Sequence, residues 1–218
     1  MRIRRKKWAQ KELEESKFYI DKPDEFRGKW GEKFINKQPL HIELGCGKGI
    51  FSATLASNHR ENNYIAVDMI EAMLGLSKRN IEQAYEYKDP ENLYLIRANV
   101  EKISEVFDIK DNVERIYINF CNPWPKKKHA KRRLTSHTFL PIYQRILKNE
   151  GQLILKTDNR SLFEFSLISF QQFHMNFHDI CLDLHNSDGY EDNIQTEYER
   201  KFSPYGPIYR IVTTFEGE

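Results

Sequence analysis

The sequence predicts an α/β fold in which a mostly parallel β-sheet is covered by helices on both faces. Short apolar segments rich in β-branched and aromatic residues recur along the chain, and segments of helical patterning separate them. Such alternation implies right-handed crossovers, which place helices on both faces of the sheet. At 218 residues the chain is long enough for one domain of this kind with a sizeable core.

The chain is predicted to be a single domain with two parts. Residues 1–38 form a basic arm and an irregular lead-in, and residues 39–218 form the core of the domain. Five of residues 2–7 are Lys or Arg, and residues 8–20 suit a short helix. The rest of the lead-in mixes proline and glycine with aromatic residues, whose rings we expect to pack against the core.

Within the core, strands and helices are expected to follow one another in a regular order. The strands are predicted at residues 40–44, 64–67, 92–96, 113–120, 152–156, 177–184 and 208–215. The helices are predicted at residues 50–57, 70–87, 135–147 and 161–173. Residues 149–151, Asn-Glu-Gly, are predicted to form a turn.

Composition excludes several classes of protein. Hydrophobic residues make up 39% and charged residues 30%, which suits a globular chain rather than a disordered one. No apolar run approaches the roughly 20 residues of a membrane helix. The N-terminus lacks the apolar segment of a secretory signal, so a cytoplasmic protein is expected. Three widely spaced cysteines without a CxxC pair indicate neither a zinc site nor a disulfide framework, and no metal is expected.

Polar residues stand at the ends of five predicted strands. They are Glu43, Asp68, Asn99, Asn122 and Asp158. Because ligands of doubly wound sheets bind at the carboxyl ends of the strands, we expect these side chains to collect along one edge and to line a site.

A glycine-rich turn follows the first of these strands, with Gly45, Gly47 and a third glycine at alternate positions. The order of glycine and lysine does not match a P-loop, and the spacing does not match a dinucleotide fingerprint. S-adenosylmethionine carries no phosphate, so acids near the turn suit it better. Glu43 is predicted to meet its amine, Asp68 its ribose hydroxyls and Asn99 its adenine edge.

A second stretch begins as the strand at residues 113–120 and stops at Cys121-Asn-Pro-Trp-Pro125, where two prolines forbid a central strand or a helix. Six of residues 126–133 are Lys or Arg. The net charge of +2 does not itself suggest nucleic acid, but two dense basic clusters favour phosphate contacts. Trp124 is expected either to stack on a base or to pack beneath the turn.

Four motifs together resemble the bacterial tRNA (guanine-N7)-methyltransferases. They read E-L-G-C-G-K-G, N-F-C-N-P-W-P-K-K-K-H-x-K-R-R, L-K-T-D-N-R and T-E-Y-E, and the likeness extends from about Lys22 to Arg210. The first motif alone indicates only a class I methyltransferase. The resemblance implies a Rossmann-like, seven-stranded sheet whose last strand is antiparallel. It also implies methyl transfer from S-adenosylmethionine to a guanosine in the variable loop of tRNA.

The resemblance also implies roles for individual residues. The cofactor is expected to contact Glu43, Gly45, Gly47, Asp68, Asn99 and Asn122. The substrate is expected to contact Lys126, Asp158, Thr196, Glu197, Tyr198 and Glu199. The RNA backbone is expected to contact Lys128, His129, Lys131, Arg132 and Arg133. The chain departs from the family at Asn122 and Asn99, where acids are usual. We expect Asn122, at the catalytic position, to orient the reactants rather than to remove a proton.

Two other functions compete with this interpretation. Asn122-Pro-Trp is similar to the Asn-Pro-Pro-aromatic turn of exocyclic-amine methyltransferases that act on nucleic acids. The two asparagines in place of acids are also compatible with a non-catalytic RNA-binding protein on a methyltransferase fold. The expected partner is tRNA, and the sequence leaves both a monomer and a homodimer open.

Overall fold

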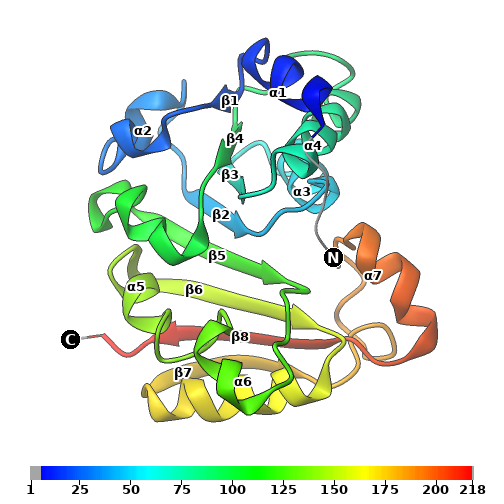
Figure 1. Ribbon diagram of the computed structural model, residues 1–218. Coiled ribbons are helices and arrows are strands. Elements are labelled where there is room, and N and C mark those ends of the chain that lie inside the picture. The colour runs from blue at the N-terminus through cyan, green and yellow to red at the C-terminus, as the bar shows by residue number, and fades with distance from the viewer. Residues whose placement is uncertain (1–5, 218) are drawn as a thin grey trace.

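A computed structural model describes residues 6–217, and its centre is an eight-stranded sheet in the order β1-β4-β3-β2-β5-β6-β8-β7 (Figure 1). The strands are β1 Tyr19–Ile20, β2 Leu40–Leu44, β3 Asn63–Asp68, β4 Leu93–Arg97, β5 Val113–Asn119, β6 Leu147–Thr157, β7 Met175–Cys181 and β8 Tyr209–Phe215. The α-helices are α1 Lys7–Glu14, α2 Trp30–Lys33, α3 Ile50–Asn58, α4 Glu71–Ala84, α5 Leu140–Gln144, α6 Arg160–Gln172 and α7 Glu197–Phe202. Five short 3-10 segments, η1 Pro23–Phe26, η2 Val100–Glu105, η3 Ile109–Asp111, η4 Lys127–Arg132 and η5 Ser203–Tyr205, lie between them.

The predicted α/β class is confirmed, including the antiparallel last strand. The strands from β1 to β6 pair in parallel, whereas β8 runs antiparallel to both β6 and β7. The strand count is eight rather than seven because the lead-in adds β1 beside β4. This strand has only two residues, too few to show a sequence pattern of its own.

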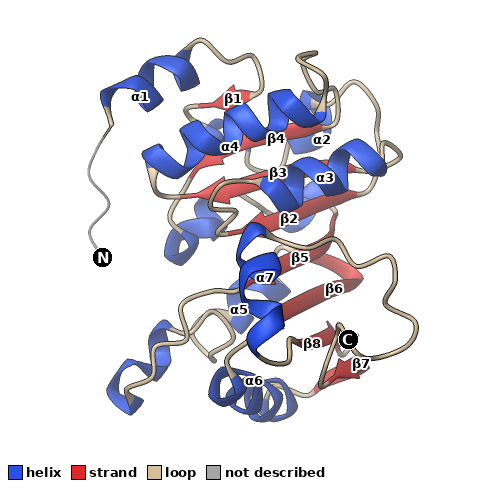
Figure 2. Cartoon of the chain, turned by 90° about the vertical axis from the view of Figure 1, so that its right-hand side faces the viewer, coloured by secondary structure: helices blue, strands red, loops and turns tan. Residues whose placement is uncertain are grey.

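Helices cover both faces of the sheet (Figure 2). On one face α1, α3 and α4 bury a cluster that includes Leu13, Ala56 and Leu74. On the other face α2, α5 and α6 bury a larger cluster with Trp30 and Phe170 at its ends. Because successive strand residues point to opposite faces, the central strands supply side chains to both clusters and are buried throughout.

The lead-in packs on the domain as expected. Trp30 is fully buried and its indole Nε1 donates to the backbone oxygen of Val106 at 2.9 Å. α1 lies directly against α4, where Gly75 permits the contact: a Cβ at that position would stand 2.7 Å from the Cβ of Ala9. Most of the predicted basic arm, residues 2–5, lies outside the described residues. No helix of residues 6–217 is long and apolar enough to cross a bilayer.

The helix predicted at residues 135–147 is the main error in the element assignment. Only Leu140–Gln144 is α-helical, and Leu147 already belongs to β6. Thr135, where the helix was predicted to begin, is buried, and its hydroxyl lies 2.7 Å from that of Ser166. The predicted turn at residues 149–151 is instead an irregularity inside β6, where Glu150 adopts a φ of 59°. Pairing of Leu147 with Val113 of β5 therefore overrides the helical pattern at the end of residues 135–147.

Candidate functional site

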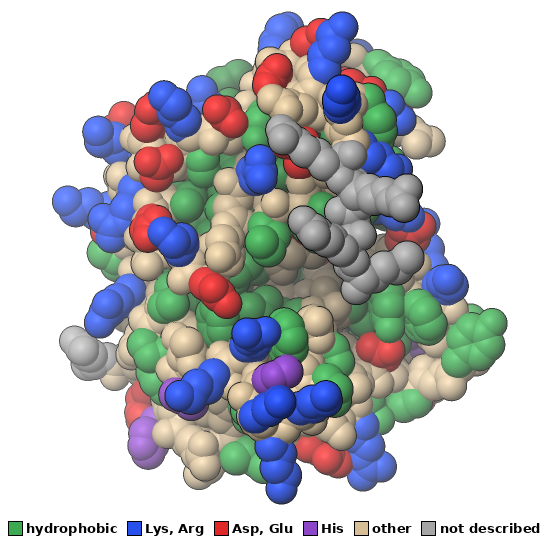
Figure 3. Space-filling view, viewed as in Figure 1, with side chains coloured by type: hydrophobic (Ala, Val, Ile, Leu, Met, Phe, Trp, Pro, Cys, Tyr) green, Lys and Arg blue, Asp and Glu red, His purple; other side chains and the backbone are tan. Residues whose placement is uncertain are grey.

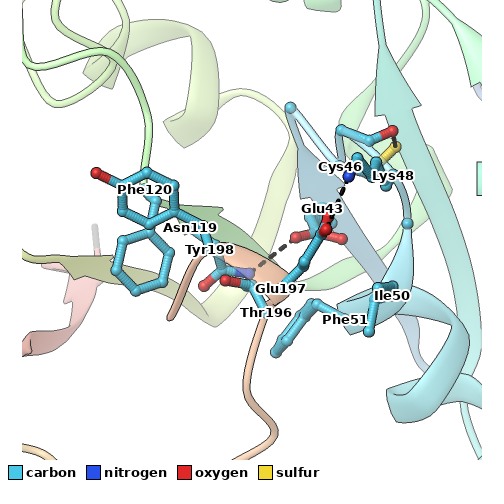
Figure 4. A pocket seen from close by; sticks show the side chains of 13 residues that line it. Glu43, Cys46, Lys48, Ile50, Phe51, Asn119, Phe120, Thr196, Glu197 and Tyr198 are labelled. Carbon is cyan, nitrogen blue, oxygen red and sulfur yellow. Dashed lines mark hydrogen bonds and ion pairs between the residues drawn. The ribbon is translucent and has the colours of Figure 1, made fainter. Parts of the chain in front are cut away.

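A pocket of about 180 Å³ lies at the carboxyl edge of the sheet, between the glycine turn after β2 and the start of α7 (Figure 4). Its polar walls come from Glu43, Asn119, Thr196 and Glu197, and its aromatic walls come from Phe51, Phe120 and Tyr198. Residues 45–50 complete the lining. The strand-end location is the one predicted for a ligand site on this kind of sheet.

The glycine turn has a left-handed backbone, with φ of 82° at Gly45, 56° at Gly47 and 69° at Gly49. The amide nitrogen of Gly45 donates to the backbone oxygen of Val67 at 2.8 Å, which ties the turn to β3. Gly49 has a second reason to lack a side chain, because a Cβ there would stand 1.9 Å from the Oγ of Ser77. Glycine is thus required for both conformation and space.

Asp68 holds this turn from the end of β3. Its carboxylate accepts from the amide nitrogens of Gly47 at 2.9 Å and of Ile70 at 2.8 Å. Burial raises the pKa of Asp68, while these backbone hydrogen bonds oppose the rise. Asp68, the residue predicted to bind the ribose, therefore also organises the turn that forms the pocket wall.

Glu43 is the most deeply buried acid in the pocket lining, with 4% of its surface exposed. Its carboxylate accepts from the hydroxyl of Ser52 at 2.5 Å and from the amide Nδ2 of Asn119 at 2.9 Å. Burial raises the pKa of Glu43, and these two hydrogen bonds oppose the rise. The pocket thus contains a poorly solvated carboxylate that a bound cation would stabilise.

Asn119 is a pocket residue that the sequence prediction missed. Glu43 pairs with Tyr117 in the parallel register of β2 and β5, so Asn119, two residues further on, points to the same face as Glu43. The prediction chose Asn122, the second asparagine of the same motif, because it follows the strand. The period of two along β5 was the available signal for Asn119.

Asn122 lies in the turn after β5 and is exposed. Its Oδ1 accepts from the amide nitrogen of Trp124 at 3.1 Å. Phe120 and Trp124 have φ of 50° and 43°, a conformation that non-glycine residues rarely adopt. Asn122 does not line the pocket, but Phe120, two residues before it, does. Asn122 therefore lies in a strained turn that begins at the pocket lining but is not itself part of that lining.

The basic run supports this turn and is also exposed to solvent. The guanidinium of Arg133 donates to the backbone oxygens of Pro123 and Trp124, both at 3.1 Å. The guanidinium of Arg132 lies 4.9 Å above the ring centre of Trp124, and His129 meets the edge of that ring at 5.5 Å. One face of the Trp124 ring is thus covered by the protein itself.

Four further cations of this run, Lys126, Lys127, Lys128 and Lys131, are exposed. The space-filling view shows a group of Lys and Arg side chains at the lower centre of this face, and further ones along its left and upper edges (Figure 3). The predicted RNA contacts therefore divide into residues that hold the turn and residues that face solvent.

The segment from Thr196 to Tyr198 forms the opposite wall of the pocket. Glu197 pairs with Lys48 of the glycine turn at 2.7 Å. The hydroxyl of Tyr198 donates to Asp158 at 3.1 Å. In this structure the predicted substrate contacts Glu197, Tyr198 and Asp158 are held by partners within the chain.

Glu199 is fully buried and anchors this segment from behind. Its carboxylate meets the Nζ of Lys156 at 2.7 Å and the Nε2 of His185 at 3.0 Å, and it accepts from Asn193 at 2.7 Å. It also forms a capping box with Thr196 at the start of α7. Glu199 is not part of the pocket lining, whereas Thr196 is.

Two predicted site residues, Asn99 and Asp158, lie at or next to the start of a helix. Asn99 caps η2 by accepting from the amide of Glu101 at 3.0 Å, and it lines a different cavity, beside Ala98. Asn159, not Asp158, caps α6. The carboxylate of Asp158 instead accepts from the hydroxyl of Tyr198.

A family model described as "Putative methyltransferase" matches residues 37–210. A "tRNA (guanine-N(7)-)-methyltransferase" of Clostridium botulinum (strain Alaska E43 / Type E3) is 50% identical over 208 residues, covering 94% of both chains. One of the same name from Listeria innocua serovar 6a is 48% identical over 218 residues, covering 99% of both.

Solved structures with similar folds are more distant in sequence. An antibiotic-related methyltransferase superposes with a TM-score of 0.59 at 18% identity, over 85% of this chain and 90% of its own. The 16S rRNA methyltransferase KamB gives a TM-score of 0.59 at 12% identity, with the same coverage. These likenesses concern the fold.

Proposed function

The chain belongs to the tRNA (guanine-N(7)-)-methyltransferase family and is an S-adenosylmethionine-dependent enzyme, and we propose that the pocket between the glycine turn and residues 196–198 is where it methylates N7 of a tRNA guanine. The observation that carries this assignment is the buried Glu43 carboxylate beside a left-handed glycine turn, at the carboxyl edge of a methyltransferase sheet. The position of the guanosine in the variable loop follows from the family resemblance.

The pocket residues fit the proposed cofactor. The amino-acid part of S-adenosylmethionine carries an ammonium group, which can stabilise the desolvated carboxylate of Glu43. The three glycines of the turn, Gly45, Gly47 and Gly49, present only backbone to the ligand. Asp68 lies behind this turn with further acceptor capacity for ribose hydroxyls. When bound, the cofactor supplies a methyl group activated by a sulfonium.

Methylation at N7 requires little acid–base chemistry from the protein. N7 of neutral guanine has a free lone pair and no proton, so no general base is needed to expose the nucleophile. The residues of the site act by holding the base and the methyl donor in line and by excluding water. Orientation of this kind contributes about 7–11 kcal/mol to lowering a barrier.

Asn122 suits an orienting role. Its Oδ1 already fixes the turn by accepting from Trp124, and an amide does not act as a base at neutral pH. It forgoes the charge-assisted part of the hydrogen bonds that the family's usual Asp would make. That difference is on the order of 1 kcal/mol, which slows the reaction without abolishing it.

The exposed cations beside this turn are proposed to hold the tRNA backbone. Lys126, Lys128 and Lys131 face solvent, and Arg132 lies over Trp124, from which it can turn to a phosphate. His129 and Arg133 are proposed to support them by keeping the turn in place. Contacts of this kind position an RNA without reading its sequence.

Thr196 to Glu199, with Asp158, are proposed to receive the guanine. Glu197 and Tyr198 exchange their contacts with Lys48 and Asp158 for contacts with the base. Carboxylates there suit the N1–H and exocyclic amine of guanine, which are donors. Glu199 acts through its capping box with Thr196, since it is buried and fully paired.

The decisive test is methyl transfer from labelled cofactor to tRNA, followed by chemical cleavage at 7-methylguanosine. We expect label in the tRNA and one cleavage site. A matched tRNA with 7-deazaguanosine at that site lacks the N7 lone pair and should take no label. Label on the 7-deaza tRNA would instead indicate an exocyclic amine as the acceptor. Cofactor binding without any transfer would indicate a non-catalytic RNA-binding protein. We also propose that the protein is cytoplasmic and acts as a monomer or a homodimer.

A further inference from the structure

The side-chain amide of Asn119 is only half satisfied. The residue lines the pocket and is 7% exposed. Its Nδ2 donates to Glu43 at 2.9 Å, as Figure 4 shows, but its Oδ1 is buried and has no hydrogen-bond partner within residues 6–217. A buried carbonyl oxygen without a donor is unfavourable, and such groups in native proteins usually await a water or a ligand.

The surroundings of this oxygen favour a cationic donor. Asn119 stands on the same face of the sheet as Glu43, whose pKa burial raises. The neighbouring cation on that face, Lys156, pairs with Asn119 in the β5–β6 register but directs its ammonium to Glu199 at 2.7 Å. The Glu43 carboxylate and a carbonyl oxygen that has no donor among the described residues are therefore side by side. A neutral guanine edge would satisfy the carbonyl but would leave the carboxylate charge uncompensated.

We propose that Asn119 is a cofactor-binding residue whose Oδ1 accepts a hydrogen bond from the α-ammonium of the amino-acid part of the cofactor. This inference rests on the proposed function, because it deepens the cofactor assignment of the same pocket. An ammonium has three donors and needs several acceptors. Glu43 supplies the charge, and Asn119 supplies a second acceptor while its Nδ2 keeps Glu43 oriented.

Ser52 offers a matched control. Its hydroxyl also orients Glu43, at 2.5 Å, but it is buried on α3 and is not part of the pocket lining. Ser52→Ala therefore removes one hydrogen bond to Glu43 and no ligand acceptor. Asn119→Ala removes one hydrogen bond to Glu43 and the ligand acceptor as well.

The experiment compares two probes by isothermal titration calorimetry. S-adenosylhomocysteine carries the ammonium, whereas 5′-methylthioadenosine keeps the nucleoside and the thioether but lacks the amino-acid part. For Asn119→Ala we expect the Kd of the first probe to rise on the order of 10- to 100-fold, as for the loss of a hydrogen bond to a charged group. The Kd of the second should change by less than about twofold. Ser52→Ala should raise the Kd of S-adenosylhomocysteine by a clearly smaller factor than Asn119→Ala does.

Several results would overturn the proposal. An unchanged Kd for S-adenosylhomocysteine would show that Oδ1 makes no contact with it. Equal losses for both probes would mean that Asn119 only shapes the pocket. A loss in Ser52→Ala as large as in Asn119→Ala would mean that the orientation of Glu43 explains the effect. If Asn119→Ala does not fold, Asn119→Ser takes its place with the same expected difference between probes. A wild-type protein that binds neither probe would overturn the proposed function itself.

Discussion

The buried ion pair between Lys156 and Glu199 supports the wall of the pocket, and breaking it should be costly. Lys156 is 3% exposed, and its ammonium reaches three acceptors: Glu199 at 2.7 Å, the backbone oxygen of Ile194 at 2.8 Å and the side chain of Asn193 at 3.1 Å. Its three donors are thus all used. Lys156→Met keeps most of the aliphatic volume but leaves the fully buried carboxylate of Glu199 without its cation.

The magnitude follows from this geometry. Removing one partner of a buried pair costs about 3–5 kcal/mol, because the remaining charge stays in a medium that solvates it poorly. His185 and Asn193 still contact Glu199, which favours the lower half of that range. For a chain of this size each kcal/mol lowers Tm by roughly 2–4 °C, so a loss of about 3–4 kcal/mol corresponds to a fall of about 6–16 °C.

Thermal and urea unfolding of wild type and Lys156→Met measure this loss. Arg160→Ala is the control, because Arg160 and Glu164 form an exposed pair one helical turn apart, whose loss should leave the Tm nearly unchanged. Adding Glu199→Gln to Lys156→Met neutralises the orphaned charge and should restore at least about 1 kcal/mol. A loss in Lys156→Met no larger than in Arg160→Ala would refute the reasoning.

Three further predictions concern the site itself. Glu43→Gln should raise the Tm of the ligand-free protein by about 2–4 °C, because it removes a buried charge, and should abolish the stabilisation that cofactor adds in the same melting assay. Because burial raises the pKa of Glu43, the ionised carboxylate destabilises the ligand-free protein at pH values above that pKa. As the pH is lowered through the raised pKa, the free energy of unfolding of the ligand-free protein should rise. The affinity for the cofactor should fall over the same pH range, because the carboxylate loses its charge. Lys131→Ala with Arg132→Ala should weaken tRNA binding and reduce the salt slope by up to about 2 in filter-binding assays, and an unchanged slope would count against phosphate contact. Asn122→Asp should raise kcat about fivefold in single-turnover methylation, corresponding to ~1 kcal/mol; an inactive wild type beside an active variant would contradict the orienting role.

The sequence by itself determined the fold class and the edge of the sheet that carries the site. Strand periodicity, the glycine turn and the prolines after β5 are local signals, and each of the seven predicted strands is present in the structure. The errors in the predicted strands occurred where pairing with a distant strand determines whether a segment is a strand and where it begins. β1 exists because β4 has a free edge, and β6 begins at Leu147 because Val113 pairs with it.

Only the tertiary structure decided which polar residues meet. The register of β2, β5 and β6 places Glu43, Asn119 and Lys156 on one face, and no local pattern encodes a register between strands 37 or more residues apart. The sequence therefore singled out Asn122, which follows the strand, over Asn119, which lies within it. It also could not show that Lys156 and Glu199, 43 residues apart, neutralise each other. Burial converts such distant neighbours into strong interactions because water no longer competes for them.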